Sequence, residues 1–305
     1  MDLFASGFNA WRQLHFSPTD PSVEPDDVAS FEKVLTDKLI EIPYASLTCT
    51  IVNTSARLRH AGSMDEDIES ELMRKLLSST AAIAGNGTVA IYNGQDAIIQ
   101  HAPSTSPCAA EVKGRQTFTG MHDIIQLVAY ETGFVALSGD GKVWTWGDER
   151  YASTLGREAS TSSPAEKPGL VEDLDDLPSG KIKKIAAGGY TVLALTQGND
   201  LYGWGGHPAR QPILDMLSSS PSPVDIEEND IVDCSVGETH AIVLTTSGDV
   251  YVIGENANGQ LGLGVPSKRI TQWKRVALSA AGKAVVGVKA GHRSSFIVTK
   301  DMRLT

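Results

Sequence analysis

One stretch of this chain is repeated further on, and the repetition constrains the fold more than any other feature. GFVALSGDGKVWTWGDE, residues 133–149, returns as HAIVLTTSGDVYVIGEN, residues 240–256, with nearly every glycine and aliphatic residue in register. These copies close on Gly147 and Gly254. A third copy closes on Gly205, degraded copies end at Gly62 and Gly94, and a sixth, SSFIVTKDMRLT, stops at the C-terminus. Such a period indicates one supersecondary unit stacked many times.

Each copy predicts β-strands. Residues 134–146 form two apolar runs around a turn of small and polar residues, which is the pattern of a β-hairpin. A third apolar run lies upstream and ends at Gly188, Gly237 and Gly291 in three copies, each seven residues before an equivalent aliphatic position. A glycine at that point favours a bend where backbones approach closely.

The N-terminus carries only the second half of a copy. In LFASGFNAWRQL the glycine is Gly7, and Gln13 stands six positions beyond it, as Gln260 and Gln211 do beyond their closing glycines. The sixth copy lacks this half. We therefore predict that the termini share one blade, in which residues 3–7 pair with residues 294–298.

The copies resemble the repeats of the regulator-of-chromosome-condensation family, of the form G-x-x-H-x-x-A-L-T-x-x-G-x-V-Y-x-W-G-x-N-x-x-G-Q-L-G. The best match is GETHAIVLTTSGDVYVIGENANGQLGLG, residues 237–264. The resemblance implies an all-β fold: one closed β-propeller domain over residues 1–305, built from four-stranded blades. The intervals between closing glycines predict six blades, and a seventh hidden between Asn93 and Asp123 is the alternative.

One helix is expected between blades, over residues 63–77. Ser63 to Glu66 has the pattern of a capping box, and Met64, Ile68, Leu72 and Leu76 recur every four residues.

Composition indicates a cytoplasmic or nuclear protein. The sequence opens directly on a strand pattern, without a signal peptide or a long apolar span. Its three cysteines, Cys49, Cys108 and Cys234, are scattered and form no C-x-x-C pair, which favours free thiols over a zinc site or disulfides.

Charge directs attention to the closing blade. The net charge is −11, yet residues 268–305 hold nine Lys and Arg against one acidic residue. Closure is expected to bring Arg12 and His15 onto the blade formed by this segment. The resulting basic and aromatic edge has the composition of an interface hot spot, and would attract an acidic protein or an RNA backbone. The predicted partner-binding residues are Trp11, Arg12, Trp273, Lys274, Arg275 and Arg293.

Two other interpretations of charge stay open. Trp273 could pack between blades while the lysines are solvated. The acidic clusters at residues 24–27, 65–71, 172–176 and 227–230 read as solubilising loops, and are the next candidates for binding.

Catalytic motifs are missing from the sequence. It contains no G-x-S-x-G, H-E-x-x-H, P-loop or dinucleotide fingerprint, and residues 139–142 read as a hairpin turn. His240 occupies the position of the family's own repeat histidine, where a packing role is expected. We therefore predict a protein that is not an enzyme, with no cofactor and no metal site.

The resemblance implies two functions from different classes. The first is a non-catalytic adaptor, similar in form to the accessory propeller that pairs with a small zinc-binding protein in diphthamide synthesis and tRNA modification, or to the propeller that partners an oxygenase. The alternative is guanine-nucleotide exchange on a Ran-type GTPase. The acidic total and the lack of a basic tail disfavour direct DNA binding.

Overall fold

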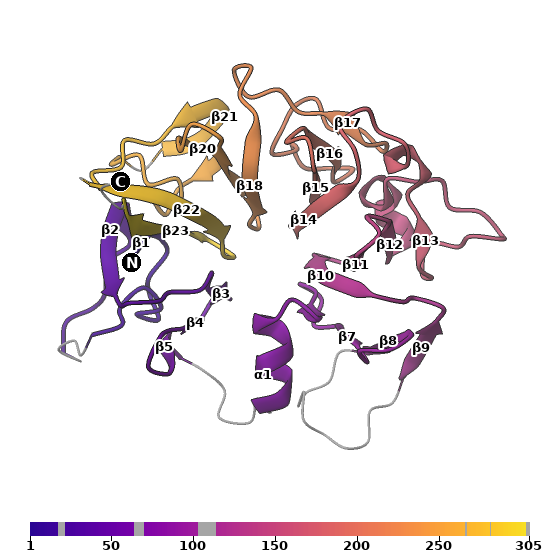
Figure 1. Ribbon diagram of the computed structural model, residues 1–305, viewed down its shortest axis with the longest axis horizontal. Helices are drawn as coiled ribbons and strands as arrows, with labels where there is room; N and C mark the ends of the chain where they lie inside the picture. The colour runs from indigo at the N-terminus through magenta and orange to yellow at the C-terminus, as the bar shows by residue number, and fades with distance from the viewer. Residues whose placement is uncertain (18–21, 64–69, 103–113, 266, 281, 303–305) are drawn as a thin grey trace. The chain divides into compact units, whose positions relative to one another are not determined.

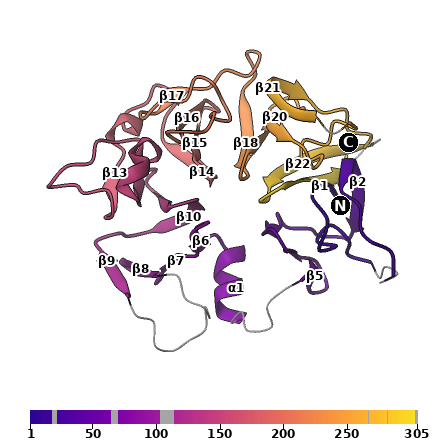
Figure 2. The same cartoon turned by 180° about the vertical axis from the view of Figure 1, so that it is seen from behind.

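The computed structural model describes residues 1–17, 22–63, 70–102, 114–265, 267–280 and 282–302. The chain forms two units, the first made of residues 1–64 with 229–305 and the second of residues 65–228. Figures 1 and 2 show the sheets of each unit from opposite sides. Each unit holds three antiparallel sheets.

The first unit contains the sheet that joins the two termini. Its strands lie in the order β2-β1-β23-β22, so the N-terminus supplies two strands and the C-terminus the other two. Leu3 pairs with Val298 and Gly7 with Ser294, which confirms the predicted register. The strands of this closing sheet are β1 (Asp2–Gly7), β2 (Val28–Thr36), β22 (Lys283–Ala290) and β23 (Ser294–Asp301).

Two further sheets complete the first unit. One is the three-stranded sheet β3 (Tyr44–Ala45), β4 (Cys49–Asn53) and β5 (Leu58–Gly62). The other is the sheet β18 (Ile231–Val236), β19 (His240–Thr245), β20 (Val250–Asn256) and β21 (Ser267–Arg275). The sheet of β18 to β21 is a neighbour of the closing sheet, since β18 and β19 both contact β22.

The second unit consists of three four-stranded sheets. The first is β6 (Ala81–Ile83), β7 (Val89–Tyr92), β8 (Ala97–His101) and β9 (Gln116–Thr119). The second is β10 (Ile124–Tyr130), β11 (Gly133–Ser138), β12 (Val143–Gly147) and β13 (Gly169–Leu170). The third is β14 (Ile182–Gly188), β15 (Thr191–Thr196), β16 (Leu201–Gly205) and β17 (Ser222–Pro223).

Short helices lie between strands of these sheets. The helix α1 (Ser70–Leu77) confirms the second half of the predicted helix, whereas residues 64–69 lie outside the described part. Two 3-10 helices, Glu149–Leu155 and Glu172–Leu174, follow β12 and β13.

The sheets are the blades of a six-bladed β-propeller. The all-β class, the six-blade count and the shared closing blade are confirmed. The seven-blade alternative is wrong, because β8 and β9 complete the sheet begun by β6 and β7 instead of starting another. A single domain over residues 1–305 stays a prediction.

Blades within each unit are joined by buried side chains at repeat positions. Trp146 and Trp204 each precede a closing glycine and are buried. Their indole N–H groups donate to Gln100 Oε1 (2.7 Å) and to the Thr154 carbonyl (3.0 Å), both in the preceding blade. Polar tips of buried aromatic residues are thereby satisfied across the blade boundary.

His240 plays the predicted packing role in the first unit. Its ring is fully buried, and its Nε2 lies 3.2 Å from the Ser294 carbonyl and 3.0 Å from Ser295 Oγ, both in the closing sheet. Burial lowers its pKa to about 4, so the ring is neutral at physiological pH.

Candidate protein-interaction site

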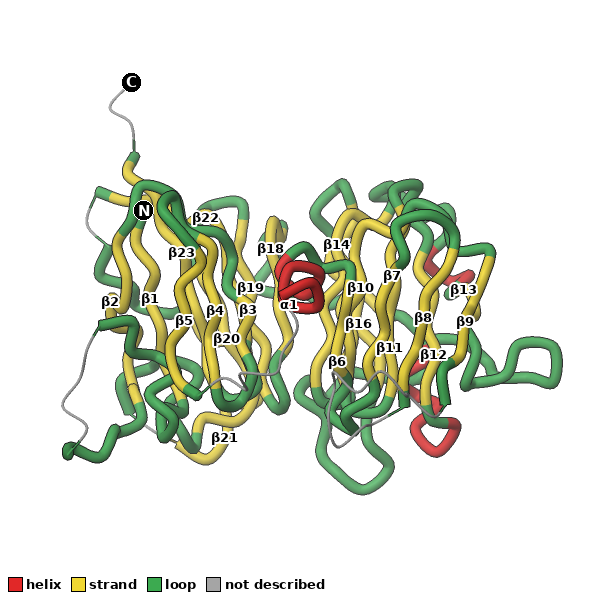
Figure 3. Tube along the Cα trace, turned by 90° about the horizontal axis from the view of Figure 1, so that it is seen from below, coloured by secondary structure: helices red, strands yellow, loops and turns green. Residues whose placement is uncertain are grey.

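The strands of each sheet run side by side, so their connections gather at two ends (Figure 3). We call one the glycine end: it holds the closing glycine and the two-residue turn between the first and second strands. The other is the hairpin end, which holds the turn between the second and third strands. Loops on a rigid scaffold are the usual location of binding residues.

One backbone hydrogen bond recurs at the glycine end. In five blades, the residue after the closing glycine donates its N–H to the carbonyl of the second turn residue. The pairs are Phe8 to Arg293 (2.9 Å), Ser63 to Thr48 (3.0 Å), Asp148 to Thr132 (3.2 Å), Gly206 to Tyr190 (2.8 Å) and Glu255 to Thr239 (2.9 Å). The backbone of the turn is thus fixed by the repeat, whereas its side chains differ from blade to blade.

In one pair of neighbouring blades of each unit, a second bond ties the turn to that of the next blade. Glu131 donates its N–H to the Gly189 carbonyl (2.8 Å) in the second unit. Glu238 does the same to the His292 carbonyl (3.0 Å) in the first unit. These neighbouring turns are therefore held in a fixed spacing.

The closing glycines permit this close approach. Gly254 has a φ of +112°, and a Cβ there would lie 2.3 Å from the Thr239 carbonyl oxygen. Gly205, at φ +116°, would meet the Tyr190 carbonyl at the same distance. A side chain is excluded both by the backbone conformation and by the contact.

An ionic cluster occupies the glycine end of the first unit. Glu238 accepts from His292 Nε2 (3.0 Å) and from Arg293 Nε (2.9 Å). These hydrogen bonds, that from His292 first, lower the pKa of Glu238 to about 2. Neither Glu238 nor His292 was among the residues predicted from the sequence, although both follow the equivalent glycines Gly237 and Gly291.

Trp11 and Arg12 lie at the same end of the closing sheet, in the loop after Gly7. The loop is held by Gln13, whose Oε1 accepts from the Trp11 N–H (3.0 Å) and whose Nε2 donates to the Leu47 carbonyl (3.0 Å). Arg12 adopts a φ of +58° and donates to the Val23 carbonyl. The Trp11 side chain is 51% exposed on this fixed loop.

The matching loop of the neighbouring blade shows that Trp11 is not demanded by the repeat. Gln260 Oε1 there accepts from the N–H of Asn258 (3.0 Å), which occupies the position of Trp11. A large exposed apolar side chain in place of asparagine has no evident structural role.

The other three predicted residues are not on the closing blade, and this part of the prediction is wrong. Trp273, Lys274 and Arg275 belong to β21, the outer strand of the neighbouring sheet. Antiparallel pairing places Arg275 opposite Tyr251, at the hairpin end. Trp273 is half-buried and Lys274 is exposed. The predicted edge therefore divides into Trp11, Arg12 and Arg293 at one end and residues 273–275 at the other.

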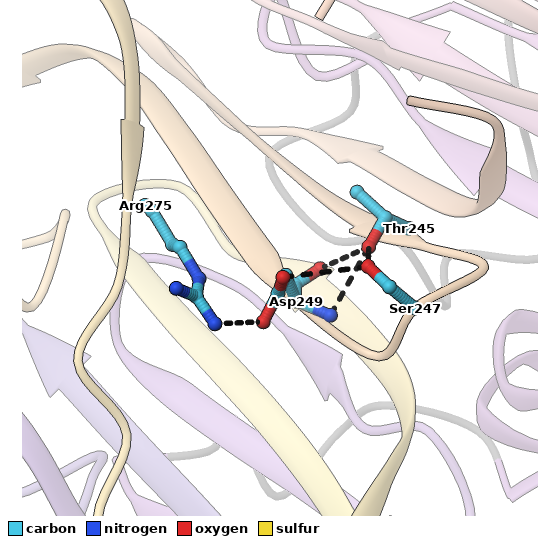
Figure 4. A network of polar contacts seen from close by, with 4 residues as sticks. All are labelled: Thr245, Ser247, Asp249 and Arg275. Carbon is cyan, nitrogen blue, oxygen red and sulfur yellow. Dashed lines mark hydrogen bonds and ion pairs between the residues drawn. The ribbon is translucent and has the colours of Figure 1, made fainter. Parts of the chain in front are cut away.

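Arg275 belongs to a polar network that stabilises a turn. Its guanidinium lies 2.5 Å from Asp249 Oδ1, and the Asp249 N–H donates to Thr245 Oγ1 (3.1 Å), which contacts Ser247 Oγ (2.7 Å) (Figure 4). Equivalent hairpins repeat the inner bond: Asp200 N–H donates to Thr196 Oγ1 (3.0 Å). The network is thus a feature of the repeat to which Arg275 adds an ion pair.

A cavity of about 530 Å³ adjoins this network at the hairpin end of the first unit. Its charged lining residues are compensated within the chain. Arg275 pairs with Asp249, and Lys283 pairs with Asp2 (2.7 Å) and Asp301 (3.2 Å). The lining offers little net charge to a ligand.

The described ranges contain neither a metal-ligand group nor a membrane-spanning helix. There, no three His, Cys, Asp or Glu side chains are grouped closely enough to hold a metal ion. No helix in those ranges has the length and hydropathy to cross a bilayer. Cys49 and Cys234 are buried and form no disulfide with a described residue, and Cys108 lies outside the described part.

Comparison with known families identifies the repeat. The model described as "Regulator of chromosome condensation (RCC1) repeat" matches residues 182–207 and 231–260, and a second model of that repeat matches residues 247–298. These ranges include the glycine ends around Gly205 and Gly254.

Curated relatives match over about half of the chain. The human probable E3 ubiquitin-protein ligase HERC6 is 33% identical over 154 residues, 48% of this chain and 14% of that protein. The mouse regulator of chromosome condensation is 30% identical over 148 residues, 47% of this chain and 33% of its own length. The chain thus spans a third or less of these relatives.

Solved structures support the fold over nearly the whole chain. Prp20p from Saccharomyces cerevisiae, described with its binding to Gsp1p and histones, aligns with a TM-score of 0.69, at 15% identity, over 99% of this chain and 92% of that one. Human WBSCR16 aligns with a TM-score of 0.58, at 13% identity, over 99% and 100%. At these identities the likeness concerns the fold alone.

Proposed function

Because the chain is a β-propeller of the regulator-of-chromosome-condensation type, we propose that it acts as a non-catalytic protein-interaction module, the adaptor or regulatory subunit of a partner complex. The observation that carries this proposal is the half-exposed Trp11 on a fixed loop, at the same sheet end as Arg12 and Arg293. Tryptophan and arginine dominate the binding energy of protein interfaces. A rigid loop also reduces the entropy lost when they are buried.

The partner is a protein with acidic groups near an apolar pocket. Trp11 would enter the pocket, while Arg12 and Arg293 would meet the carboxylates around it. We further propose that this partner is a small zinc-binding protein of tRNA modification and diphthamide synthesis, or an oxygenase, in the cytoplasm or the nucleus. An RNA backbone could contact the same basic groups. The chain itself would supply neither cofactor nor catalytic group.

Binding of a partner can be tested with variants at opposite ends of the first unit. The full chain carrying Trp11→Ala with Arg293→Ala is compared with wild type in capture from native-host extract, followed by mass spectrometry. We expect the variant to lose a partner that wild type retains. The matched control is Lys274→Ala with Arg275→Ala, which should retain it. Equal capture by all three proteins would place the interface elsewhere.

Guanine-nucleotide exchange is the second candidate function. It is favoured by the 30% identity to the mouse regulator of chromosome condensation and by the fold shared with Prp20p, whose structure is described with its binding to Gsp1p. A fluorescent-nucleotide release assay with Ran separates the two. The adaptor proposal expects the spontaneous release rate, and a clear acceleration would favour exchange.

A further inference from the structure

An aromatic cluster lies at the glycine end of the second unit. Tyr151, Tyr190 and His207 come from the 3-10 helix after β12, the turn between β14 and β15, and the loop after β16. Ring centroids are 4.9 Å apart for Tyr151 and Tyr190, 4.6 Å for Tyr190 and His207, and 5.3 Å for Tyr151 and His207. All three side chains are half-buried, so part of each remains exposed.

The repeat does not require aromatic residues here. The turn position of Tyr190 is held by Thr132, Thr239 and Arg293 in other blades, with the same backbone hydrogen bond. Aromatic side chains that are exposed and dispensable for the fold are characteristic of binding surfaces. A role outside folding therefore explains the cluster better than packing does.

The cluster is preformed. Gly206 donates its N–H to the Tyr190 carbonyl (2.8 Å), and Ser153 Oγ donates to the Gly206 carbonyl (2.7 Å). A hydrogen bond links Tyr190 to Tyr151, and burial, followed by this contact, raises the pKa of Tyr190 to about 12. Both loops are thus held together before any partner arrives, which lowers the entropic cost of binding.

The rings already attract cations. The Arg150 guanidinium lies 5.8 Å from the Tyr151 centroid and that of Arg210 lies 5.9 Å from the Tyr190 centroid. Both distances are near the outer limit of cation–π contact, about 6 Å. Both arginines are exposed, and Arg150 is also held by Asp148 (2.5 Å). The distant and exposed Arg210 can be displaced by a cation that approaches more closely.

Charge selects the class of partner. Residues 65–228 contain 23 Asp and Glu against 12 Lys and Arg, whereas the remainder of the chain contains 14 of each. The second unit therefore carries the whole net charge of −11. Near the cluster, Glu131 interacts with Tyr190, and Glu149 is exposed beside Arg150. Such a field attracts positive groups and repels an acidic chain.

We propose that the surface formed by Tyr151, Tyr190 and His207 docks an arginine- or lysine-bearing segment of a protein partner. The cationic side chain packs on the tyrosine rings, and the surrounding carboxylates orient it. This inference deepens and rests on the proposed function as an interaction module. It assigns a second surface, separate in sequence and in chemistry from that of Trp11.

Peptides selected by binding from a library of random sequences test this surface, so the natural partner need not be identified first. A random twelve-residue peptide library displayed on phage is selected on the full-length protein, and the enriched peptides are synthesised. Their affinities are measured for wild type, Tyr151→Ala with Tyr190→Ala, Arg210→Ala, and the control Trp11→Ala. We expect peptides rich in Arg and Lys whose affinity falls at least about tenfold in the tyrosine variant, as for hot-spot residues.

Arg210→Ala should change the peptide affinity in the opposite direction. Removing the chain's own cation from Tyr190 should raise the affinity of a basic peptide by about twofold or more. This variant keeps the proposal testable should the double tyrosine variant misfold. Weaker binding to Arg210→Ala would instead indicate an acidic ligand and would overturn the proposal.

Other outcomes separate this surface from the proposed function. Peptides that bind the tyrosine variant as well as wild type, but lose affinity with Trp11→Ala, overturn the second surface and leave the adaptor function supported. Enrichment of apolar or acidic peptides alone overturns it as well. A selection that enriches no peptide also overturns the second surface. The adaptor function is then tested by the capture of a partner from extract.

Discussion

The glycine ends of the two units have the same backbone and opposite side-chain chemistry. In the first unit the turns carry an ionic cluster, Glu238 with His292 and Arg293. In the second unit the corresponding turn and loops carry Tyr190, Tyr151 and His207. The N–H bonds that fix both turns are the same. The repeat therefore specifies a framework, and the residues that it leaves unspecified determine what each unit can bind.

The largest expected effect tests the shared backbone. Gly254→Ala in the first unit and Gly205→Ala in the second should each lower the free energy of unfolding by about 3 kcal/mol or more, because each adds a clash to an unfavourable φ. Urea denaturation measures both. The control is Gly248→Ala, also at positive φ (+86°) but with no atom within 4 Å of the added Cβ. It should cost about 1–2 kcal/mol.

A mild effect of the substitution at either closing glycine would show that this glycine does not constrain the backbone as proposed. Were only one of the two variants strongly destabilised, the two glycine ends would not share a backbone constraint.

Acid sensitivity should distinguish the ionic end. The pKa of Glu238 is lowered to about 2, so its stabilising contribution is fully present above the unfolded value near 4.5 and is lost as pH falls toward 2. Glu238→Gln should remove about 1 kcal/mol at pH 6, a figure reduced for partial solvent exposure, and progressively less below pH 4. Urea unfolding across this pH range gives the difference.

The titration of His240 also changes the free energy of unfolding with pH, and it must be separated from the effect of Glu238. Its lowered pKa, about 4, means that protonation favours the unfolded chain between about pH 6.5 and 4. Because the Glu238 carboxylate slightly raises this pKa, Glu238→Gln should lower it a little further and leave the direction of the effect unchanged. A Glu238→Gln difference that persists unchanged to pH 2 would show that Glu238 is not held as an ion pair.

The smallest effect on stability is expected at the aromatic end. Tyr190→Thr introduces the residue type found at this turn position in three other blades, Thr48, Thr132 and Thr239. It should cost no more than about 1 kcal/mol, the value of the lost ring contacts. Thermal unfolding tests this. A cost near that of Gly205→Ala would mean that Tyr190 is a structural residue.

The strands and closing glycines of each blade could be predicted from the sequence because they recur in every copy of the repeat. The register of residues 3–7 with 294–298 followed from equal spacings around Gly7 and Gly254. The packing role of His240 followed from its place in the repeat.

The site was predicted less well because its residues depart from the repeat. Trp11, Arg12 and Arg293 lie at one end, but assigning residues 273–275 to the closing blade failed. Charge density along the sequence does not reveal where one sheet ends: β21 is the fourth strand of the preceding blade. Tyr190 and Tyr151 were missed, since their proximity depends on two loops that are separated in sequence.

The central claim is that binding residues lie at the glycine end, and partner affinity tests it most directly. Titration calorimetry would compare a purified partner's affinity for wild type, Trp11→Ala with Arg293→Ala, and the hairpin-end pair Lys274→Ala with Arg275→Ala, after all three are shown to melt alike. We predict at least about a tenfold loss for the glycine-end pair and less than about twofold for the hairpin-end pair. The reverse order of losses would contradict the account.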